Sequence, residues 1–188
     1  MKKLLIISPA FPRDASESHV IPFLQHVLLH FRAQFPEIEI TLVALHKPVS
    51  KPYVWHGIKV IPLCGNDVRY PRKMAFVARA VLQIRKLHKT CPFDGILNLW
   101  YHDVGALCHH LHPKTFTWML GQDVRKDNLA LRLFRPDPRR IVALSHYNND
   151  ILAQCWRIRA HQVIPMAINE SLFPELNTGP RTIDILGA

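Results

Sequence analysis

Three polar side chains, Tyr101, His102 and Asp103, directly follow the apolar run at 95–100 and could act on a hydroxylated ligand. An aromatic ring and an imidazole at such a place can stack on a sugar ring or form hydrogen bonds with it. A second interpretation stays open, in which Asp103 begins a helix as its N-cap and Tyr101 covers the core.

A second polar group follows the apolar run at 115–120 and consists of Gly121, Gln122, Asp123, Arg125 and Lys126. Asp123 could accept hydrogen bonds from sugar hydroxyls while the two cations meet a phosphate. It could equally be an N-cap or a turn carboxylate bonded to local amides. We treat Asp123 as a weak candidate for a catalytic group.

The loop after the first apolar run carries Arg13, Asp14 and His19, which are candidates for a ligand cleft or are ordinary exposed polar groups. The same loop lacks the pattern G-x-G-x-x-G, so no nicotinamide cofactor is expected. No G-x-S-x-G nucleophile motif is present either.

Four potential metal ligands cluster at Cys108, His109, His110 and His112. Helical geometry places only Cys108 and His112 on a common face, so the four cannot converge on one ion from a single helix. We therefore expect no metal site and no cofactor.

The elements that must position these groups are seven apolar runs rich in β-branched and aliphatic residues, which predict strands. They are residues 3–8, 38–45, 57–63, 95–100, 115–120, 140–145 and 162–165. Helical spacing of apolar residues lies between them. The predicted helices are 20–35 with Pro22 in the first turn, 74–87, 103–111, 128–134, and 146–156 with Ser145 as N-cap.

Apolar strands that alternate with helices indicate an α/β fold: a Rossmann-like, doubly wound, mostly parallel sheet of about seven strands with helices on both faces. Ligands of such folds bind beyond the carboxyl ends of the strands, near the point where strand order reverses. Four loops therefore matter, at 9–19, 100–103, 120–127 and 145–149.

The 188 residues, of which 48% are apolar, suffice for one domain, and the net charge of +10 predicts an anionic partner. Cations concentrate at 69–89 and 132–140, and each segment is either a solvated face or a binding patch. The leading apolar run is too short for a signal peptide or a membrane span, and the four cysteines form no CxxC pair. We expect a cytoplasmic protein.

Four segments together resemble the N-terminal domain of the family-4 retaining glycosyltransferases, which have the two-domain GT-B fold. Residues 94–102 (DGILNLWYH) are similar to the family's D-[IV]-[IV]-H-x-H, and 120–125 (LGQDVR) to H-G-x-D-[VI]-R. Residues 141–146 (IVALSH) are similar to I-[IV]-A-[VL]-S, and 163–173 (VIPMAINESLF) to V-I-P-N-G-[VI]-D-x-x-x-F. The four segments follow one another in the order and at the spacing of the family. The resemblance covers nearly the whole chain.

The sequence also departs from the family pattern. Leu120 stands where the family has a histidine that faces the reacting sugar, and Met166-Ala167 replaces an Asn-Gly turn. Residues 14–20 (DASESHV) keep Glu17, His19 and Val20 of G-G-x-E-x-H-V but lack both glycines.

The resemblance implies transfer of a sugar from a nucleotide-sugar, which is a substrate rather than a cofactor, to an acceptor hydroxyl with retention. It implies that residues 1–180 are the acceptor-side domain. Residues 173–180 have the Pro, Asn, Thr and Gly of a linker, and 181–188 (RTIDILGA) predict a strand. This strand either begins a donor-binding domain, in which case this chain alone would be inactive, or pairs back onto the same sheet. The acceptor would be a saccharide or a lipid-linked saccharide of cell-surface polysaccharide or glycolipid synthesis.

The basic helix within 71–89 and the 132–140 segment could hold the protein at the inner face of an anionic membrane. The alternative is a nonenzymatic protein that binds an anionic membrane or a nucleic acid on a Rossmann-like scaffold. No nucleic-acid motif is recognisable, so no nucleic acid is expected.

Overall fold

The computed structural model describes residues 2–46, 51–65, 72–110 and 112–166. The predicted strand at 181–188, the domain boundary at 180 and the end of the fourth family-like segment lie outside these residues.

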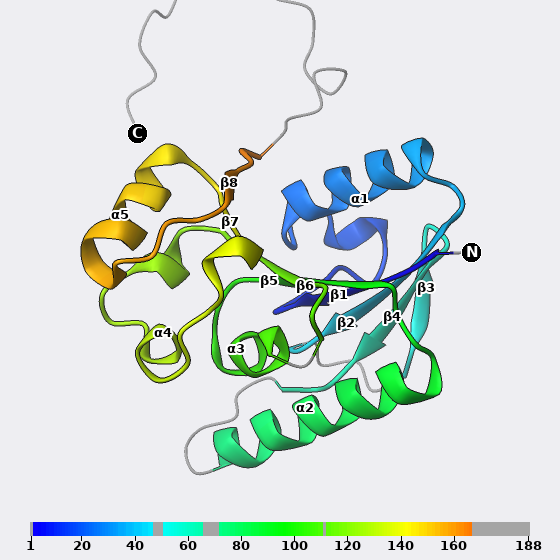
Figure 1. Cartoon of the computed structure of the whole chain (residues 1–188). Helices are drawn as coiled ribbons and strands as arrows, with labels where there is room; N and C mark the ends of the chain where they lie inside the picture. Colours follow the sequence, from blue (N-terminus) through cyan, green and yellow to red (C-terminus); the bar gives the residue numbers. More distant parts are fainter. Residues whose placement is uncertain (1, 47–50, 66–71, 111, 167–188) are drawn as a thin grey trace, which may run out of the picture.

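The described strands form one sheet in the order β3-β4-β2-β1-β5-β6-β7-β8 (Figure 1). All neighbours are parallel except β3 and β4. Their bounds are β1 Lys2–Ser8, β2 Ile38–Ala44, β3 Tyr53–Trp55, β4 Ile58–Pro62, β5 Gly95–Leu99, β6 Thr115–Met119, β7 Ile141–Ala143 and β8 Gln162–Val163. The arrangement is an α/β fold consistent with a Rossmann-like domain.

Eight strands are described where about seven are expected, because Tyr53–Trp55 was not predicted as a strand. It is antiparallel to β4 and pairs Trp55 with Ile58. The two residues between them, His56 and Gly57, both have positive φ, which is the requirement of a type I′ hairpin turn. The other seven strands coincide with the predicted runs to within a few residues.

The five α-helices in the described part of the chain lie where periodicity predicts them. They are α1 Pro22–Gln34, α2 Arg72–Thr90, α3 Asp103–His109, α4 Leu129–Leu133 and α5 His146–Trp156. Pro22 opens α1, and the Ser145 side chain accepts a hydrogen bond from the Asn148 N–H as the N-cap of α5. The N-cap of α3 is His102, whereas Asp103 is the first residue of the helix. The described residues also form three short 3-10 helices: η1 Ala15–Glu17, η2 Gln122–Val124 and η3 Pro138–Arg140.

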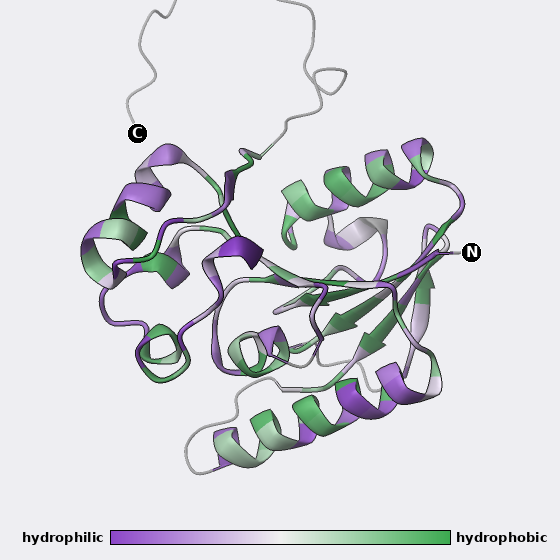
Figure 2. Cartoon of the chain, viewed as in Figure 1, coloured by the Kyte–Doolittle hydropathy of each residue, from purple (hydrophilic) through white to green (hydrophobic). Residues whose placement is uncertain are grey.

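Helices cover both faces of the sheet, with α1 on one side and α2 and α3 on the other (Figure 1). The side chains of β1 alternate accordingly: Leu5 and Ile7 pack in the cluster with α2 and α3, while Ile6 packs in the cluster with α1. A third cluster lies under α4 and α5. Hydrophobic strands run between helices that carry both hydrophobic and hydrophilic residues (Figure 2).

Candidate functional site

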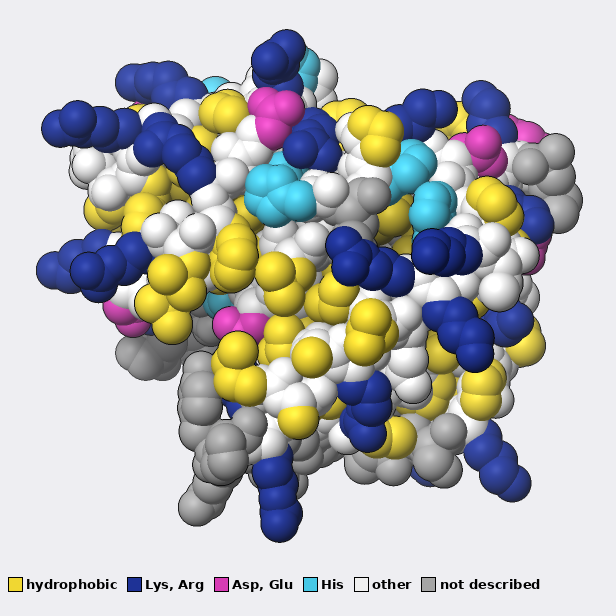
Figure 3. Space-filling view, turned by 60° about the horizontal axis from the view of Figure 1, so that its bottom comes forward, with side chains coloured by type: hydrophobic (Ala, Val, Ile, Leu, Met, Phe, Trp, Pro, Cys, Tyr) yellow, Lys and Arg dark blue, Asp and Glu magenta, His cyan; other side chains and the backbone are white. Residues whose placement is uncertain are grey.

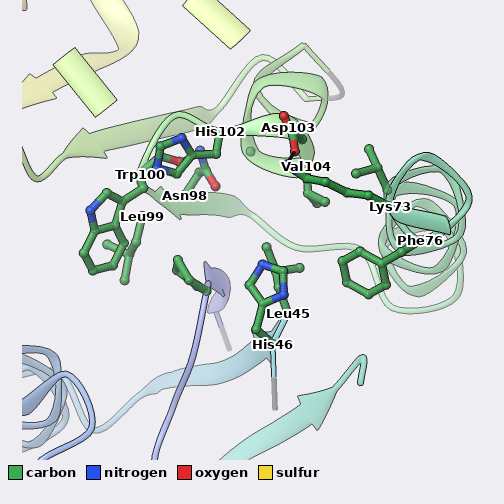
Figure 4. A pocket seen from close by; sticks show the side chains of 13 residues that line it. Leu45, His46, Lys73, Phe76, Asn98, Leu99, Trp100, His102, Asp103 and Val104 are labelled. Carbon is green, nitrogen blue, oxygen red and sulfur yellow. Dashed lines mark hydrogen bonds and ion pairs between the residues drawn. The ribbon is translucent and has the colours of Figure 1, made fainter. Parts of the chain in front are cut away.

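A cavity of about 310 Å³ lies at the carboxyl ends of β1, β2 and β5 (Figure 4). β1 has β2 on one side and β5 on the other, so successive strands are added in opposite directions from this point. Such a switch point is where open α/β sheets bind ligands. Its walls come from Pro9 after β1, Leu45 and His46 after β2, Asn98 and Leu99 of β5, Trp100 and His102 after it, the first turn of α3, and Lys73, Phe76 and Val77 of α2.

Asn98 is the most unusual group of this wall. It is 1% exposed, and its Nδ2 donates hydrogen bonds to the Trp100 carbonyl at 3.0 Å and to Thr117 Oγ1 at 3.3 Å. The Trp100 carbonyl can only accept, which fixes the orientation of the amide. Asn98 Oδ1 then remains without a hydrogen-bond partner among the described residues. An unsatisfied buried acceptor is costly, so it marks a place where a ligand donor would be stabilised.

Backbone geometry beside Asn98 is equally constrained. Trp100 has φ of 64°, a left-handed conformation that a bulky residue rarely adopts. The Asn98 amide bonded to the Trp100 carbonyl holds this turn. Gly105 makes it possible for α3 to approach, because a Cβ there would lie 2.7 Å from the Trp100 oxygen. Only a glycine fits this contact.

Two charged groups, Lys73 and Asp103, join α2 to α3 at the rim of the cavity, with Lys73 Nζ 2.7 Å from Asp103 Oδ2. This ion pair offsets the charge that Lys73 would otherwise bring. The exposed His46 lies across from Asn98, and its Nδ1 is 3.0 Å from the Gly65 carbonyl (Figure 4). A carbonyl accepts only, so Nδ1 carries a hydrogen and Nε2 of the neutral ring is an acceptor.

Behind Asn98, a buried polar chain continues through Thr117 to His109. His109 Nε2 accepts the Asp137 N–H at 3.3 Å, so its Nδ1 donates to Thr117 Oγ1 at 3.1 Å. His109 is fully buried, and this burial lowers the pKa of its imidazole to about 4. The neutral ring of His109 thus holds Thr117 in place, and Thr117 in turn accepts the hydrogen bond of Asn98 near the end of β5.

The loop after β6 places its predicted site residues differently. Asp123 is fully buried, and its carboxylate accepts the N–H groups of Tyr101 at 2.8 Å, Leu120 at 3.1 Å and Gly121 at 3.0 Å. Burial raises the pKa of the Asp123 carboxyl, and the N–H donors oppose that rise. The carboxylate therefore clamps two loops together and does not line the cavity.

The other members of that loop are Gly121, with φ of 120° at the start of η2, and the exposed Gln122, Arg125 and Lys126. None of them lines the cavity. Tyr101 is also fully buried, and its hydroxyl donates to the Phe134 carbonyl at 2.8 Å. Of the polar group after β5, His102 and Asp103 reach the cavity.

The first loop is held by local contacts. The Asp14 side chain caps η1 by accepting the Ser16 N–H, and Arg13 Nε lies 3.2 Å from Asp14 Oδ2. Arg13, Asp14 and His19 are exposed and do not line the cavity. Sequence reasoning missed His46, Lys73, Phe76 and Asn98. Asn98 carried a signal, since an amide inside a run of buried aliphatic residues needs a partner.

No three His, Cys, Asp or Glu side chains among the described residues lie close enough to hold a metal ion. No helix of the described part of the chain is both long and apolar enough to cross a bilayer. No protein-family model matches the sequence, and no curated protein matches it significantly.

Proposed function

We propose that the chain is the acceptor-side domain of a family-4-like retaining glycosyltransferase with a doubly wound, Rossmann-like architecture. Its reaction moves a sugar from a nucleotide-sugar to an acceptor hydroxyl. The observation that carries the proposal is the cavity at the switch point between β1 and β5, with Asn98 Oδ1 unpartnered in its wall.

The chemistry of the cavity suits a neutral, hydroxylated ligand. Asn98 Oδ1 and His46 Nε2 are both hydrogen-bond acceptors, and hydroxyl groups supply the matching donors. Trp100 and Phe76 add aromatic surface to the lining, which suits the apolar faces of a sugar ring. Lys73 is paired with Asp103, so the cavity does not demand a negatively charged ligand.

In this proposal the rate gain comes from positioning the acceptor hydroxyl against the donor and from stabilising the departing phosphate. Residues of this chain hold and orient the acceptor. In this proposal the nucleotide and its sugar are bound by a separate donor domain, and the present chain alone binds acceptor without turning over donor. The setting is cytoplasmic polysaccharide or glycolipid synthesis.

Acceptor binding is tested by titrating the chain with a panel of neutral mono- and oligosaccharides while recording amide NMR shifts. We expect one class of saccharide to shift amides at 45–46 and 98–105. A His46→Ala variant should weaken this binding, and His161→Ala, an exposed histidine remote from the cavity, should not. Shifts confined to other surfaces would contradict the assignment of the cavity.

Donor turnover is tested by nucleotide release from UDP- and GDP-sugars. The chain alone should release none, whereas a longer protein that adds a donor domain should release nucleotide from one donor. A robust rate from this chain alone would overturn the division of labour between two domains.

A nonenzymatic protein that binds an anionic ligand is the second candidate, and the charge of +10 favours it. Leu120 is consistent with that alternative, because its side chain is 8% exposed and packs in the core cluster under α1. At this position the family has a polar histidine. An absence of both saccharide binding and nucleotide release would favour the alternative.

A further inference from the structure

The charge of the described chain is unevenly distributed, and α2 is its most one-sided element. Residues 72–90 contain no aspartate or glutamate but carry six lysines and arginines. Only one of the six, Lys73, has a carboxylate partner in a described ion pair. A surface helix that merely faces water commonly mixes both signs, so this composition indicates a negatively charged partner.

The outer face of α2 is also partly apolar. Its inner face buries Phe76, Val77, Ala80, Val81 and Ile84 against the sheet. On the outer face Met74 is 57% exposed and Leu82 is 63% exposed. Met74, Ala78 and Leu82 follow one another at four-residue spacing, so they lie along one ridge of the helix.

Cations surround this ridge. At 100° per residue, Arg79 falls on one side of it and Arg85 falls on the other. Lys86 continues the ridge by one further four-residue step, and Lys89 follows at the C-terminal end of the helix. The view onto this side of the molecule shows apolar side chains with lysines and arginines around them (Figure 3). Apolar side chains ringed by cations are typical of helices that lie in the plane of a membrane interface.

An apolar groove of about 430 Å³ lies beside this face, between α2 and the end of β4. Ile84 and Leu87 form its wall on α2, Ile61 and Leu63 form the opposite wall, and Lys86 stands at its edge. A cation next to an aliphatic groove suits a lipid, whose phosphate and acyl chain are adjacent.

A nucleic acid would need other features. Stacking platforms for bases are aromatic side chains, and the exposed outer residues of α2 include none. Exposed Met74 and Leu82 contribute nothing to phosphate binding, whereas both gain from contact with the acyl region of a bilayer.

We infer that the outer face of α2 lies on an anionic lipid bilayer, with Arg79, Arg85, Lys86 and Lys89 at the headgroups and Leu82 at their boundary with the acyl chains. This inference goes beyond glycosyl transfer and does not depend on it. The same helix lines the candidate cavity with Lys73 and Phe76, so a bilayer-bound protein would hold that cavity near the headgroups.

The test is flotation of the 188-residue chain with vesicles of phosphatidylcholine alone and of phosphatidylcholine mixed with phosphatidylglycerol. We expect binding to the mixed vesicles that weakens with salt. An Arg85→Gln/Lys89→Gln variant should lower the partition coefficient about 25-fold, at about fivefold for each cation. The matched control Arg132→Gln/Arg139→Gln removes the same charge from exposed sites outside α2 and should leave partitioning nearly unchanged.

A Leu82→Gln variant separates a bilayer from a nucleic acid. It should reduce vesicle binding several-fold while leaving retention on a polyanion column unchanged. Four outcomes would overturn the inference: equal loss in both double variants, indifference to phosphatidylglycerol, no effect of Leu82→Gln on vesicle binding, or polyanion binding without vesicle binding. All changed side chains are exposed, and circular dichroism checks that each variant is folded.

Discussion

The loops after β5 and β6 leave neighbouring strands at the same edge of the sheet, yet one borders a cavity and the other closes on itself. After β5, His102 is exposed, and Asn98 near the end of that strand has a buried acceptor without a hydrogen-bond partner among the described residues. After β6, the only acid of η2 turns inward and is satisfied by three N–H groups. The closed loop holds the open one, because Asp123 binds the Tyr101 N–H and Asn128 Nδ2 donates to the Tyr101 carbonyl at 2.8 Å.

The difference shows that an acid at a strand end is not by itself a ligand site. In a tight loop, backbone N–H groups lie close enough to donate hydrogen bonds to the carboxylate, which then has no acceptor left for a ligand. The free hydrogen-bonding capacity lies instead one strand away, on a neutral amide.

Removing the Asp123 carboxylate, which holds the loops after β5 and β6 together, should lower the free energy of unfolding the most. Asp123→Ala leaves three N–H donors unsatisfied, those of Tyr101 and Leu120 buried and that of Gly121 half-buried, and we expect the free energy of unfolding to fall by about 4 kcal/mol. Asp123→Asn keeps an acceptor for Leu120 and Gly121 but faces the Tyr101 N–H with a donor, so about 2 kcal/mol should be lost. Urea unfolding measures both. Asp127→Ala, an exposed acid nearby, should change stability by less than about 0.5 kcal/mol, and an equal loss there would contradict the clamp.

Filling the space at Gly105, under the loop after β5, should lower the free energy of unfolding slightly less than Asp123→Ala does. Gly105→Ala places a methyl group 2.7 Å from the Trp100 carbonyl, which must move, and we expect a loss of about 3 kcal/mol with distortion of the cavity. Gly95→Ala is the matched control, since its nearest neighbour would be at 3.7 Å. Thermal unfolding that shows the two variants to be equally stable would argue against close packing at Gly105.

Low pH should lower the free energy of unfolding through His109, which lies behind Asn98 at the end of β5. The pKa of His109 is lowered to about 4 in the folded protein, against about 6.5 for an unperturbed histidine, so the unfolded chain binds the proton more tightly between these values. Stability from this group is therefore full above pH 6.5 and falls as pH decreases toward 4. We expect His109 to contribute about 2 kcal/mol of loss between pH 6.5 and 4.5.

Comparison with His109→Asn isolates this contribution. The variant should be less stable at neutral pH, because the Asp137 N–H loses its acceptor, but its stability should decline less steeply with acid. Parallel pH profiles of the two proteins in urea unfolding would show that His109 is not the titrating group.

The rim ion pair should matter least for stability. Lys73 and Asp103 are each about 40% exposed, with side-chain exposures of 42% and 39%, and exposed pairs contribute about 1 kcal/mol or less. A double-mutant cycle with Lys73→Gln and Asp103→Asn should give a coupling energy below about 1 kcal/mol. A larger coupling would mean that the rim, and not the clamp, holds the open loop in place.

Much of the fold follows from periodicity, since all seven apolar runs are strands and the five predicted helices form. The missed strand β3 has only three residues, and its pairing with β4 depends on a positive φ at His56. The propensities of the residue types do not predict a positive φ at a histidine. The candidate site was less predictable. The loops after β1 and β5 contribute to the cavity as the strand-end rule requires, but the rule does not say which side chains turn inward.

Asp123 illustrates the limit. The sequence left a ligand-binding acid and a turn carboxylate bonded to local amides equally open, and the N–H groups of Leu120 and Gly121 show that the second holds. The further bond from the Tyr101 N–H could not be predicted, because Tyr101 is distant in sequence and adjacent across the sheet. Lys73 and Phe76 were missed for a related reason. The sequence of α2 indicated a basic surface helix, and it does not predict the packing of α2 beside α3 that brings both side chains to the end of β5.

The two outermost strands have a consequence for behaviour at high concentration. β3 has three residues and β8 has two, so each leaves few unpaired backbone groups at its edge of the sheet. Lys51 and Pro52 immediately precede β3, and both residue types discourage pairing with another chain. The long, apolar strands β1 and β2, which would be hazardous at an edge, lie inside the sheet. The described sheet is therefore built to resist edge-to-edge aggregation when the protein is crowded on a surface.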